Sequence, residues 1–321
     1  MKEFLISKKE ENQRIDKYVR KVLDDAPLSF IYKVFRKKDV KANGHWVNIS
    51  YILKENDSIR IYITDAQLSE FSKPKILVNS KLLAKIIFED DNILVLNKPK
   101  GILVHGDETE KRVTLANQVL NYLYQKGEYD PACKGFIPSP AHRLDRNTSG
   151  VVIFGKNLPA LQVLEKLFKE KSGIAKHYLG LVSGIVENDG EISSPLLKDP
   201  NSGLVKVSSS RSGAKDALTR YSVIETIKDY SLLDIQIFTG RTHQIRVHMA
   251  SVHHPVVGDG KYGDFKVNRL FKEKYKLDSQ FLHASEVTFK NIPIPLDYLD
   301  GKSFKAELPK DLDEIIKDLK S

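Results

Sequence analysis

Short apolar runs, separated mostly by turns, are the feature that most limits how this chain can fold. Four of the runs have the length and apolar character of strands, and they cover residues 93–96, 151–154, 176–184 and 232–238. Many of the intervening turns are too short for the crossover helix that joins parallel neighbours. The pattern therefore predicts an α+β fold, in which a mixed, largely antiparallel sheet has helices flanking it.

Residues 1–65 have the pattern of a separate, small α/β domain. Apolar residues at helical spacing predict a helix over 15–23, and Ser29 is expected to cap a second helix. Short strands are expected over 46–49 and 58–63, because turn-forming residues precede both runs.

The chain of 321 residues is long enough for one larger domain besides this small one. Residues 66–84 contain Pro74 and show little periodicity, so the sequence predicts a linker there. Strand-like runs begin after it, and we expect the larger domain to occupy residues 85–321.

The charge balance and the cysteine content limit the partners and the compartment. Lys and Arg outnumber Asp and Glu by 51 to 42, and an excess of +9 fits a polyanionic partner, although many proteins of this charge bind no nucleic acid. Cys133 is the only cysteine, which excludes an intramolecular disulfide and favours a reducing compartment. The apolar run near Met1 is too short for a signal peptide, and no stretch could span a bilayer. We therefore expect a cytoplasmic protein with no membrane partner.

Residues 142–150 form a dense polar motif, His-Arg-Leu-Asp-Arg-Asn-Thr-Ser-Gly, directly before a predicted strand. Asp145 lies between Arg143 and Arg146, and a nearby cation favours the charged form of a carboxylate. A charged Asp suits a nucleophile better than a proton donor, whereas an isolated Asp of this kind is more often part of a structural ion pair. Both interpretations stay open on this motif alone.

Residues 239–248 form a second polar cluster, which includes Arg246. We expect Thr242 to cap a helix that begins at His243. Such a density of arginine, hydroxyl and amide groups favours a pocket for a polar or anionic ligand. His243 and His248 are five residues apart and would not share a helix face, so we expect no metal site.

Motifs for nucleotide cofactors are also missing from the sequence. Neither a G-x-x-x-x-G-K-[ST] loop nor a G-x-G-x-x-G loop follows any predicted strand. Ser149 lacks the G-x-S-x-G elbow that exposes a nucleophilic hydroxyl. We therefore expect no cofactor.

Taken together and in order, these motifs resemble the RluA-type family of pseudouridine synthases, over about residues 85–290. The matching segments are 97–105, 142–150, 176–184, 217–221, 239–248, 254–259 and 282–284. The resemblance implies the pseudouridine synthase fold and the isomerisation of uridine to pseudouridine in RNA. Residues 262–284 look closest to the branch of the family that acts on large-subunit (23S) ribosomal RNA.

The resemblance also implies roles for individual residues. Asp145 corresponds to the family carboxylate, which attacks ribose C1′ or removes a C2′ proton. Arg246 would pair with Asp145, and Tyr178 would lie against the base and accept the C5 proton. Arg143 would fill the space left when the target uridine flips out of its stack.

The small N-terminal domain resembles an S4 RNA-binding domain, whose helices present cations to folded RNA. The candidate phosphate contacts are Arg14, Lys17, Lys33, Arg36, Lys37 and Lys38. Two alternatives remain at this stage. One is a catalytically inactive ribosomal-RNA-binding or ribosome-assembly factor on the same fold, and the other is a glycosidase, for which the motifs offer no second, protonated carboxylate. No dimer seam is evident in the sequence, so we expect a monomer.

Overall fold

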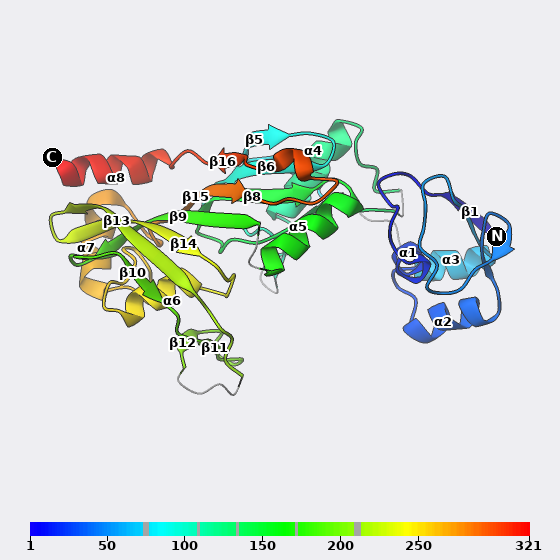
Figure 1. The fold of residues 1–321 in the computed structure, drawn as a ribbon, viewed down its shortest axis with the longest axis horizontal. Helices are drawn as coiled ribbons and strands as arrows, with labels where there is room; N and C mark the ends of the chain where they lie inside the picture. The colour runs from blue at the N-terminus through cyan, green and yellow to red at the C-terminus, as the bar shows by residue number, and fades with distance from the viewer. Residues whose placement is uncertain (73–76, 108–109, 133–134, 171–172, 209–212) are drawn as a thin grey trace.

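A computed structural model of the chain shows a small N-terminal unit at one end and a large sheet domain beside it (Figure 1). Pro74 and Cys133, which the sequence singled out, lie outside the residues that the structure describes. The described residues are 1–72, 77–107, 110–132, 135–170, 173–208 and 213–321.

The N-terminal unit packs two helices, α1 (Ile15–Val22) and α2 (Leu28–Arg36), on a four-stranded sheet in the order β1-β4-β2-β3. Its strands are β1 (Lys2–Leu5), β2 (Val40–Ala42), β3 (His45–Trp46) and β4 (Ser58–Ile61). The strand expected over 58–63 exists as the shorter β4, whereas of the range 46–49 only Trp46 lies in a strand, at the end of β3. The prediction that Ser29 caps α2 was wrong, because Pro27 is the N-cap residue and its extended backbone already directs the chain into the helix.

A third helix, α3 (Asp65–Phe71), occupies the start of the segment predicted to be a linker. Thr64 and Gln67 form a reciprocal capping box, in which each side chain accepts a hydrogen bond from the other residue's backbone N–H, at 3.1 and 3.0 Å. Phe71 packs against Phe30 of α2 with ring centroids 4.7 Å apart. The helix therefore belongs to the N-terminal unit, and the prediction of a linker from residue 66 was wrong at this point.

The large domain is built on a sheet in the order β10-β13-β14-β9-β15-β8-β6-β5, with β16 beside β15 and β7 beside β8. Every pairing described in this sheet is antiparallel except the one between β8 and β15, which confirms the predicted mixed, largely antiparallel arrangement. Its strands are β5 (Lys85–Glu89), β6 (Ile93–Lys98), β7 (Ser139–Pro140), β8 (Ser149–Gly155), β9 (Ile174–Ser183), β10 (Gly190–Ile192), β13 (Thr219–Ile227), β14 (Tyr230–Ile237), β15 (Leu282–Phe289) and β16 (Ser303–Lys305).

Helices cover both faces of this sheet. The helices α4 (Leu115–Gln125) and α6 (Gln244–Ser251) share one apolar core with the first face. On the other face, α5 (Leu158–Glu170) packs on the β6–β8 half, whereas α7 (Phe265–Tyr275) and α8 (Lys310–Lys320) pack on the β9–β14 half. A one-turn helix, Asp297–Leu299, and a separate hairpin of β11 (Leu196–Lys198) and β12 (Val205–Val207) complete the domain. No helix in the described part of the chain is long and apolar enough to cross a membrane.

The parallel pairing of β8 with β15 places the end of the 142–150 motif at the middle of the sheet. Ser149 lies opposite His283, and Gly150 lies opposite Ala284. Gly150 has φ of +114°, and a Cβ atom at this position would lie 2.1 Å from the carbonyl oxygen of Ala284. The motif therefore ends in glycine because the β15 backbone passes directly over it.

Candidate active site

Asp145 and Arg246 meet at the centre of the large domain. Asp145 lies in the loop that leads into β8, and its Oδ2 atom accepts a hydrogen bond of 3.0 Å from the NH1 group of Arg246. Arg246 lies on α6, 101 positions further along the chain. The Asp145 side chain is 27% exposed, so one flank of the ion pair is open to a ligand. The structure thus brings together the two residues that the sequence motifs had placed far apart.

A second carboxylate, Asp259, holds Arg246 in place. Its two oxygens accept hydrogen bonds of 2.6 Å from Nε and 2.7 Å from NH2 of Arg246, in the two-point geometry that guanidinium and carboxylate favour. Burial raises the pKa of Asp259, but the hydrogen bonds and the charge of Arg246 outweigh this effect, and the net pKa lies below its ordinary value. Arg246 therefore bridges a buried carboxylate and a partly exposed one, and only the exposed one can reach a ligand.

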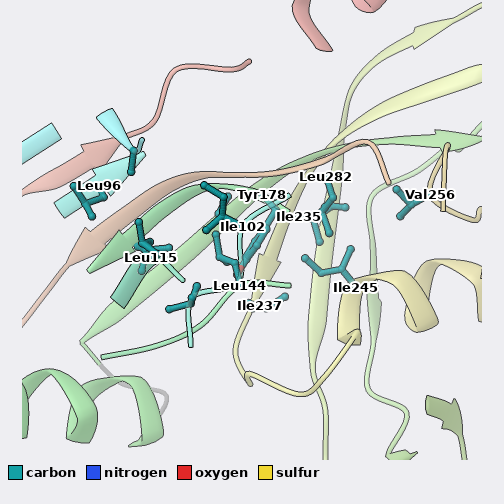
Figure 2. Packing of buried hydrophobic residues seen from close by; sticks show 14 of the residues in the cluster. Leu96, Ile102, Leu115, Leu144, Tyr178, Ile235, Ile237, Ile245, Val256 and Leu282 are labelled. Atoms are coloured by element: carbon teal, nitrogen blue, oxygen red, sulfur yellow. The ribbon is translucent and has the colours of Figure 1, made fainter. Parts of the chain in front are cut away.

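Tyr178 lies beside this ion pair, on β9. Figure 2 shows its ring in the apolar cluster with Ile102, Leu144 and Ile235. Tyr178 lines the same cavity as Asp145, with a volume of about 140 Å³. Burial, and then the negative charge of Asp145, raise the pKa of the phenol well above its ordinary value. Tyr178 is therefore a neutral phenol at neutral pH, positioned against whatever fills the cavity.

Arg143 also lines this cavity, and its side chain is exposed, whereas Asp145 and Arg246 lie deeper. Arg146, the other arginine of the motif, lies 4.0 Å from the exposed Asp107. The Asp145 carboxylate is contacted by the guanidinium of Arg246. The two neighbouring arginines face outward.

His243 and Tyr262 lie at the same ion pair, and the sequence analysis gave neither of them a catalytic role. His243 Nδ1 is 2.9 Å from the hydroxyl of Tyr262, and its Nε2 is 3.9 Å from Asp145 Oδ2. The Tyr262 ring lies against the Arg246 guanidinium, whose central carbon is 5.2 Å from the centroid of the ring. Burial lowers the pKa of His243, while the charge of Asp145 raises it. Neither residue could be found from spacing, since their contacts depend on the folded loop.

The prediction that Thr242 caps a helix beginning at His243 was wrong. The helix α6 begins at Gln244, and His243 is the N-cap residue with a left-handed backbone, φ 53°. The buried Gln244 amide accepts hydrogen bonds from Thr239 Oγ1 (2.6 Å) and Arg241 N (3.1 Å). This amide organises the turn in place of the Thr242 hydroxyl.

Lys98 is a buried cation beneath the motif. Its Nζ atom donates to three backbone carbonyls, those of Pro99 (3.0 Å), Ile102 (2.9 Å) and Arg146 (3.0 Å). Burial lowers the pKa of Lys98 to about 7, while the charge of Asp145 raises it. The three bonds tie the Asp145 loop to the end of β6, which makes Lys98 a structural support for the site.

The histidines of the second cluster do not form a metal site with one another. His248 is fully buried, with Nδ1 2.9 Å from Thr219 Oγ1 and Nε2 2.9 Å from the Ser194 carbonyl oxygen. In the described part of the chain, no three His, Cys, Asp or Glu residues lie where they could share a metal ion.

The six cations predicted to contact RNA are all exposed on the N-terminal unit. Arg14 is held by Asp16, to which its Nε and Nη2 atoms donate hydrogen bonds of 3.0 and 3.1 Å. Lys38 lies 5.4 Å from the ring centroid of Trp46, which is 48% exposed. The unit thus presents exposed cations, and one of them, Lys38, lies beside an exposed indole.

Comparison with known proteins gives consistent matches. The sequence pattern of the RNA pseudouridylate synthase family matches residues 92–251. The ribosomal large subunit pseudouridine synthase C of Vibrio parahaemolyticus is 34% identical over 283 residues, which are 87% of this chain and 85% of the relative. The enzyme of that name from Buchnera aphidicola is 34% identical over 310 residues, covering 92% and 93% of the two chains. An uncharacterized RNA pseudouridine synthase of Mycoplasma genitalium is 37% identical, covering 90% and 89%.

Solved structures share the fold. Human RNA Pseudouridylate Synthase Domain Containing 4 superimposes with a TM-score of 0.58 at 22% identity, covering 73% of this chain and 92% of the human chain. Human RNA Pseudouridylate Synthase Domain Containing 1 gives a TM-score of 0.51 at 25% identity, with 78% and 98% coverage.

Proposed function

Because this chain belongs to the RNA pseudouridine synthase family, as its motifs led us to expect, we propose that it converts uridines of large-subunit ribosomal RNA to pseudouridine, with Asp145 as the catalytic carboxylate. The observation that carries the residue assignment is the bond of 3.0 Å between Asp145 and Arg246 in a cavity that Tyr178 also lines. The choice of RNA rests on the names of the relatives, which act on the large ribosomal subunit. A ribosomal RNA substrate also supports action in the cytoplasm.

The chemistry fits a single ionised carboxylate. Breaking the bond between N1 of uracil and ribose C1′ develops positive charge at C1′, which a carboxylate stabilises or captures. Asp145 takes this role, either at C1′ or at the C2′ proton. Arg246 orients the carboxylate through a charge-assisted hydrogen bond. The uracil then turns so that its C5 atom bonds to C1′.

Tyr178 and Arg143 complete the proposed site. The Tyr178 ring is buried in the apolar cluster and lines the cavity, so it would lie against the base, and its hydroxyl is the candidate to take the C5 proton. A neutral phenol is a weak base, so it can take the C5 proton only while its own proton passes to a second base. The Asp145 carboxylate, which lines the same cavity, is that acceptor once it has released the sugar. Arg143, exposed at the mouth of the cavity, would occupy the space that the flipped uridine leaves.

Replacement of Asp145 tests this function directly. Asp145→Asn keeps the size of the side chain and removes its charge, so we expect no pseudouridine in the RNA and nearly unchanged RNA binding. The substrate is total RNA from a strain that lacks this gene, and pseudouridines are mapped before and after treatment with the protein. Wild-type turnover by Asp145→Asn would refute the assignment of the carboxylate. Tight binding of ribosomal precursors by a wild-type protein that modifies no RNA would instead identify an assembly factor.

We also propose that the N-terminal unit is an S4-like RNA-binding domain. Its exposed cations support binding to phosphates, which supplies affinity and register but little sequence information. Because α3 packs on this unit, a truncation that tests it should remove residues 1–72 and not end at residue 65. We expect the truncated enzyme to bind ribosomal RNA more weakly and with a smaller dependence on salt. Unchanged affinity would contradict the assignment.

A further inference from the structure

A basic groove adjoins the catalytic cavity. It has a volume of about 330 Å³ and shares three consecutive residues, Gly240, Arg241 and Thr242, with the cavity that holds Asp145. Lys198 and Lys215 also line it, and all the charged residues that line it in the described part of the chain are cations. The groove and the cavity therefore adjoin at residues 240–242, with the reactive carboxylate in the cavity, Arg241 at the junction, and Lys198 and Lys215 in the groove.

The hairpin of β11 and β12 directs Lys198 into this groove. Lys198 lies opposite Val205, and Leu197 lies opposite Lys206, so that neighbouring positions alternate between the two faces. Val205 lines the groove together with Lys198. Lys206 is consequently on the other face of the same hairpin, where it carries the same charge away from the groove.

The catalytic helix holds this hairpin in position. Leu196 of β11 and Val205 of β12 are buried in one small apolar cluster with Val247, which directly follows Arg246 on α6. The phenol of Tyr262 accepts a hydrogen bond of 2.9 Å from Val205 N. The position of Lys198 is therefore coupled to the helix that carries the arginine of the active site.

Hydrogen bonds also fix the other two cations of the groove, Lys215 through its backbone and Arg241 through its side chain. Lys215 exchanges two backbone hydrogen bonds of 2.9 Å with Leu196, which fixes it beside β11. Arg241 donates from Nε to the Asp216 carbonyl oxygen at 2.9 Å and lines both the groove and the catalytic cavity. Within the described residues, none of the three cations lies within ion-pair distance of a carboxylate. Their charge is available to an anion.

We propose that this groove binds the phosphodiester backbone of the RNA strand beside the flipped target uridine, with Lys198, Lys215 and Arg241 as its phosphate contacts. The inference rests on the proposed function, because it names the neighbours of the nucleotide that Asp145 acts on. An enzyme that takes a base out of its stack must hold the flanking backbone while the target turns. Arg241, shared by both cavities, marks the junction between the target and the next phosphate.

The hairpin offers a matched pair of variants. Lys198→Ala/Lys215→Ala removes charge from the groove, and Lys206→Ala removes it from the opposite face. All three side chains are exposed, so the variants should fold, which thermal unfolding checks. With ribosomal RNA from the gene-deletion strain, we expect the double variant to raise KM about tenfold with kcat within about twofold, and to reduce the salt slope of binding by roughly one to two. Lys206→Ala should change each quantity by less than about twofold.

Uncharged linkages in the RNA test whether the groove binds a backbone phosphate, and which one. In a short RNA that contains a mapped target uridine, methylphosphonates replace the flanking phosphates one at a time. At the contacted linkage, this replacement should weaken RNA binding to the wild type and to Lys206→Ala. The double variant has already lost the contact, so the replacement should leave its RNA binding unchanged. Equal effects of the double variant and Lys206→Ala, or additive losses at every linkage, would overturn the inference. Failure of the wild type to modify any RNA would instead overturn the proposed function.

Discussion

Removal of the Asp259 carboxylate tests whether this side chain holds Arg246 in place, without touching Asp145, the residue proposed to perform the chemistry. Arg246 and Asp259 are both buried, with side-chain exposures of 7% and 0%, and two short hydrogen bonds join them. In Asp259→Ala, the one side-chain hydrogen bond left to Arg246 among the described residues is the one to the partly exposed Asp145. Breaking a buried ion pair by removing one partner costs about 3–5 kcal/mol, because the remaining charge is left without compensation. We expect a loss of this size in the free energy of unfolding, measured by urea denaturation.

The same variant should also slow catalysis. A released guanidinium orients Asp145 less well, and a hydrogen bond to a charged group contributes about 1.5–3 kcal/mol, which corresponds to a fall in kcat of about 10- to 150-fold. Asp259→Asn keeps the shape and one acceptor, so it should lose less stability. Single-turnover rates on saturating RNA, measured at a temperature where both proteins are folded, separate this effect from unfolding.

A double variant provides the decisive control. Asp259→Leu/Arg246→Met replaces the ion pair with apolar groups, so it should regain most of the stability lost in Asp259→Ala while remaining inactive. A double variant as unstable as Asp259→Ala would refute the argument that the unpaired guanidinium causes the loss. Wild-type stability and turnover in Asp259→Ala would refute the whole account of the Arg246 support.

The depressed pKa of Asp259 gives this pair a pH dependence. A carboxylate whose pKa is lower in the folded protein contributes stability above its unfolded pKa of about 3.9, and this contribution is lost as the pH falls through the folded pKa. The wild type should therefore lose stability in acid more steeply than Asp259→Asn. Parallel unfolding curves for the two proteins between neutral pH and pH 3 would contradict this expectation.

Three further substitutions test other parts of the structure. Gly150→Ala puts a Cβ atom 2.1 Å from the Ala284 carbonyl oxygen, so it should cost about 3 kcal/mol or more, and an unchanged Tm would refute the close approach of β15. His177 Nδ1 lies 2.8 Å from Asp234, whose hydrogen bond raises the His177 pKa against the effect of burial, so Asp234→Asn should lower that pKa in an NMR titration. Protonated His177 stabilises the folded protein at pH values below its pKa in the unfolded chain, and this stabilisation is lost as the pH rises through its pKa in the folded protein. An unchanged His177 pKa in Asp234→Asn would show that Asp234 does not raise it. Tyr178→Phe should slow tritium release from C5-labelled uridine by about 10²- to 10⁴-fold if the hydroxyl moves the proton, and an unchanged rate would assign the ring a purely steric role.

Strand periodicity predicted the sheet well, because burial on two faces leaves continuous apolar runs such as 151–154 in β8. Helix starts were harder to predict. The start of α6 depends on Gln244, whose amide also donates to the Leu218 carbonyl oxygen at 3.0 Å, and such a distant partner cannot be read from local sequence. By contrast, the capping box of Thr64 and Gln67 is a local signal that could have revealed α3.

The site was only partly predictable for a similar reason. The proximity of Asp145 and Arg246 was expected from the family resemblance and not from spacing, since 101 positions separate them. Asp259 ends the matching segment 254–259, but no spacing or periodicity showed that its carboxylate would hold Arg246. The role of Lys98 was also hidden, because its partners are backbone carbonyls, which every residue carries.

The central place of β15 has a consequence for newly made protein. The strand lies between β8 and β9, yet residues 282–289 are synthesised long after both of them. Until β15 emerges, the half of the sheet that carries Asp145 has no strand joining it to the half that leads to Arg246. Non-local pairings of this kind form late, after the chain that they connect is available. A nascent copy, still attached to a ribosome whose RNA belongs to the proposed substrate class, would therefore be inert until residues 282–289 have emerged.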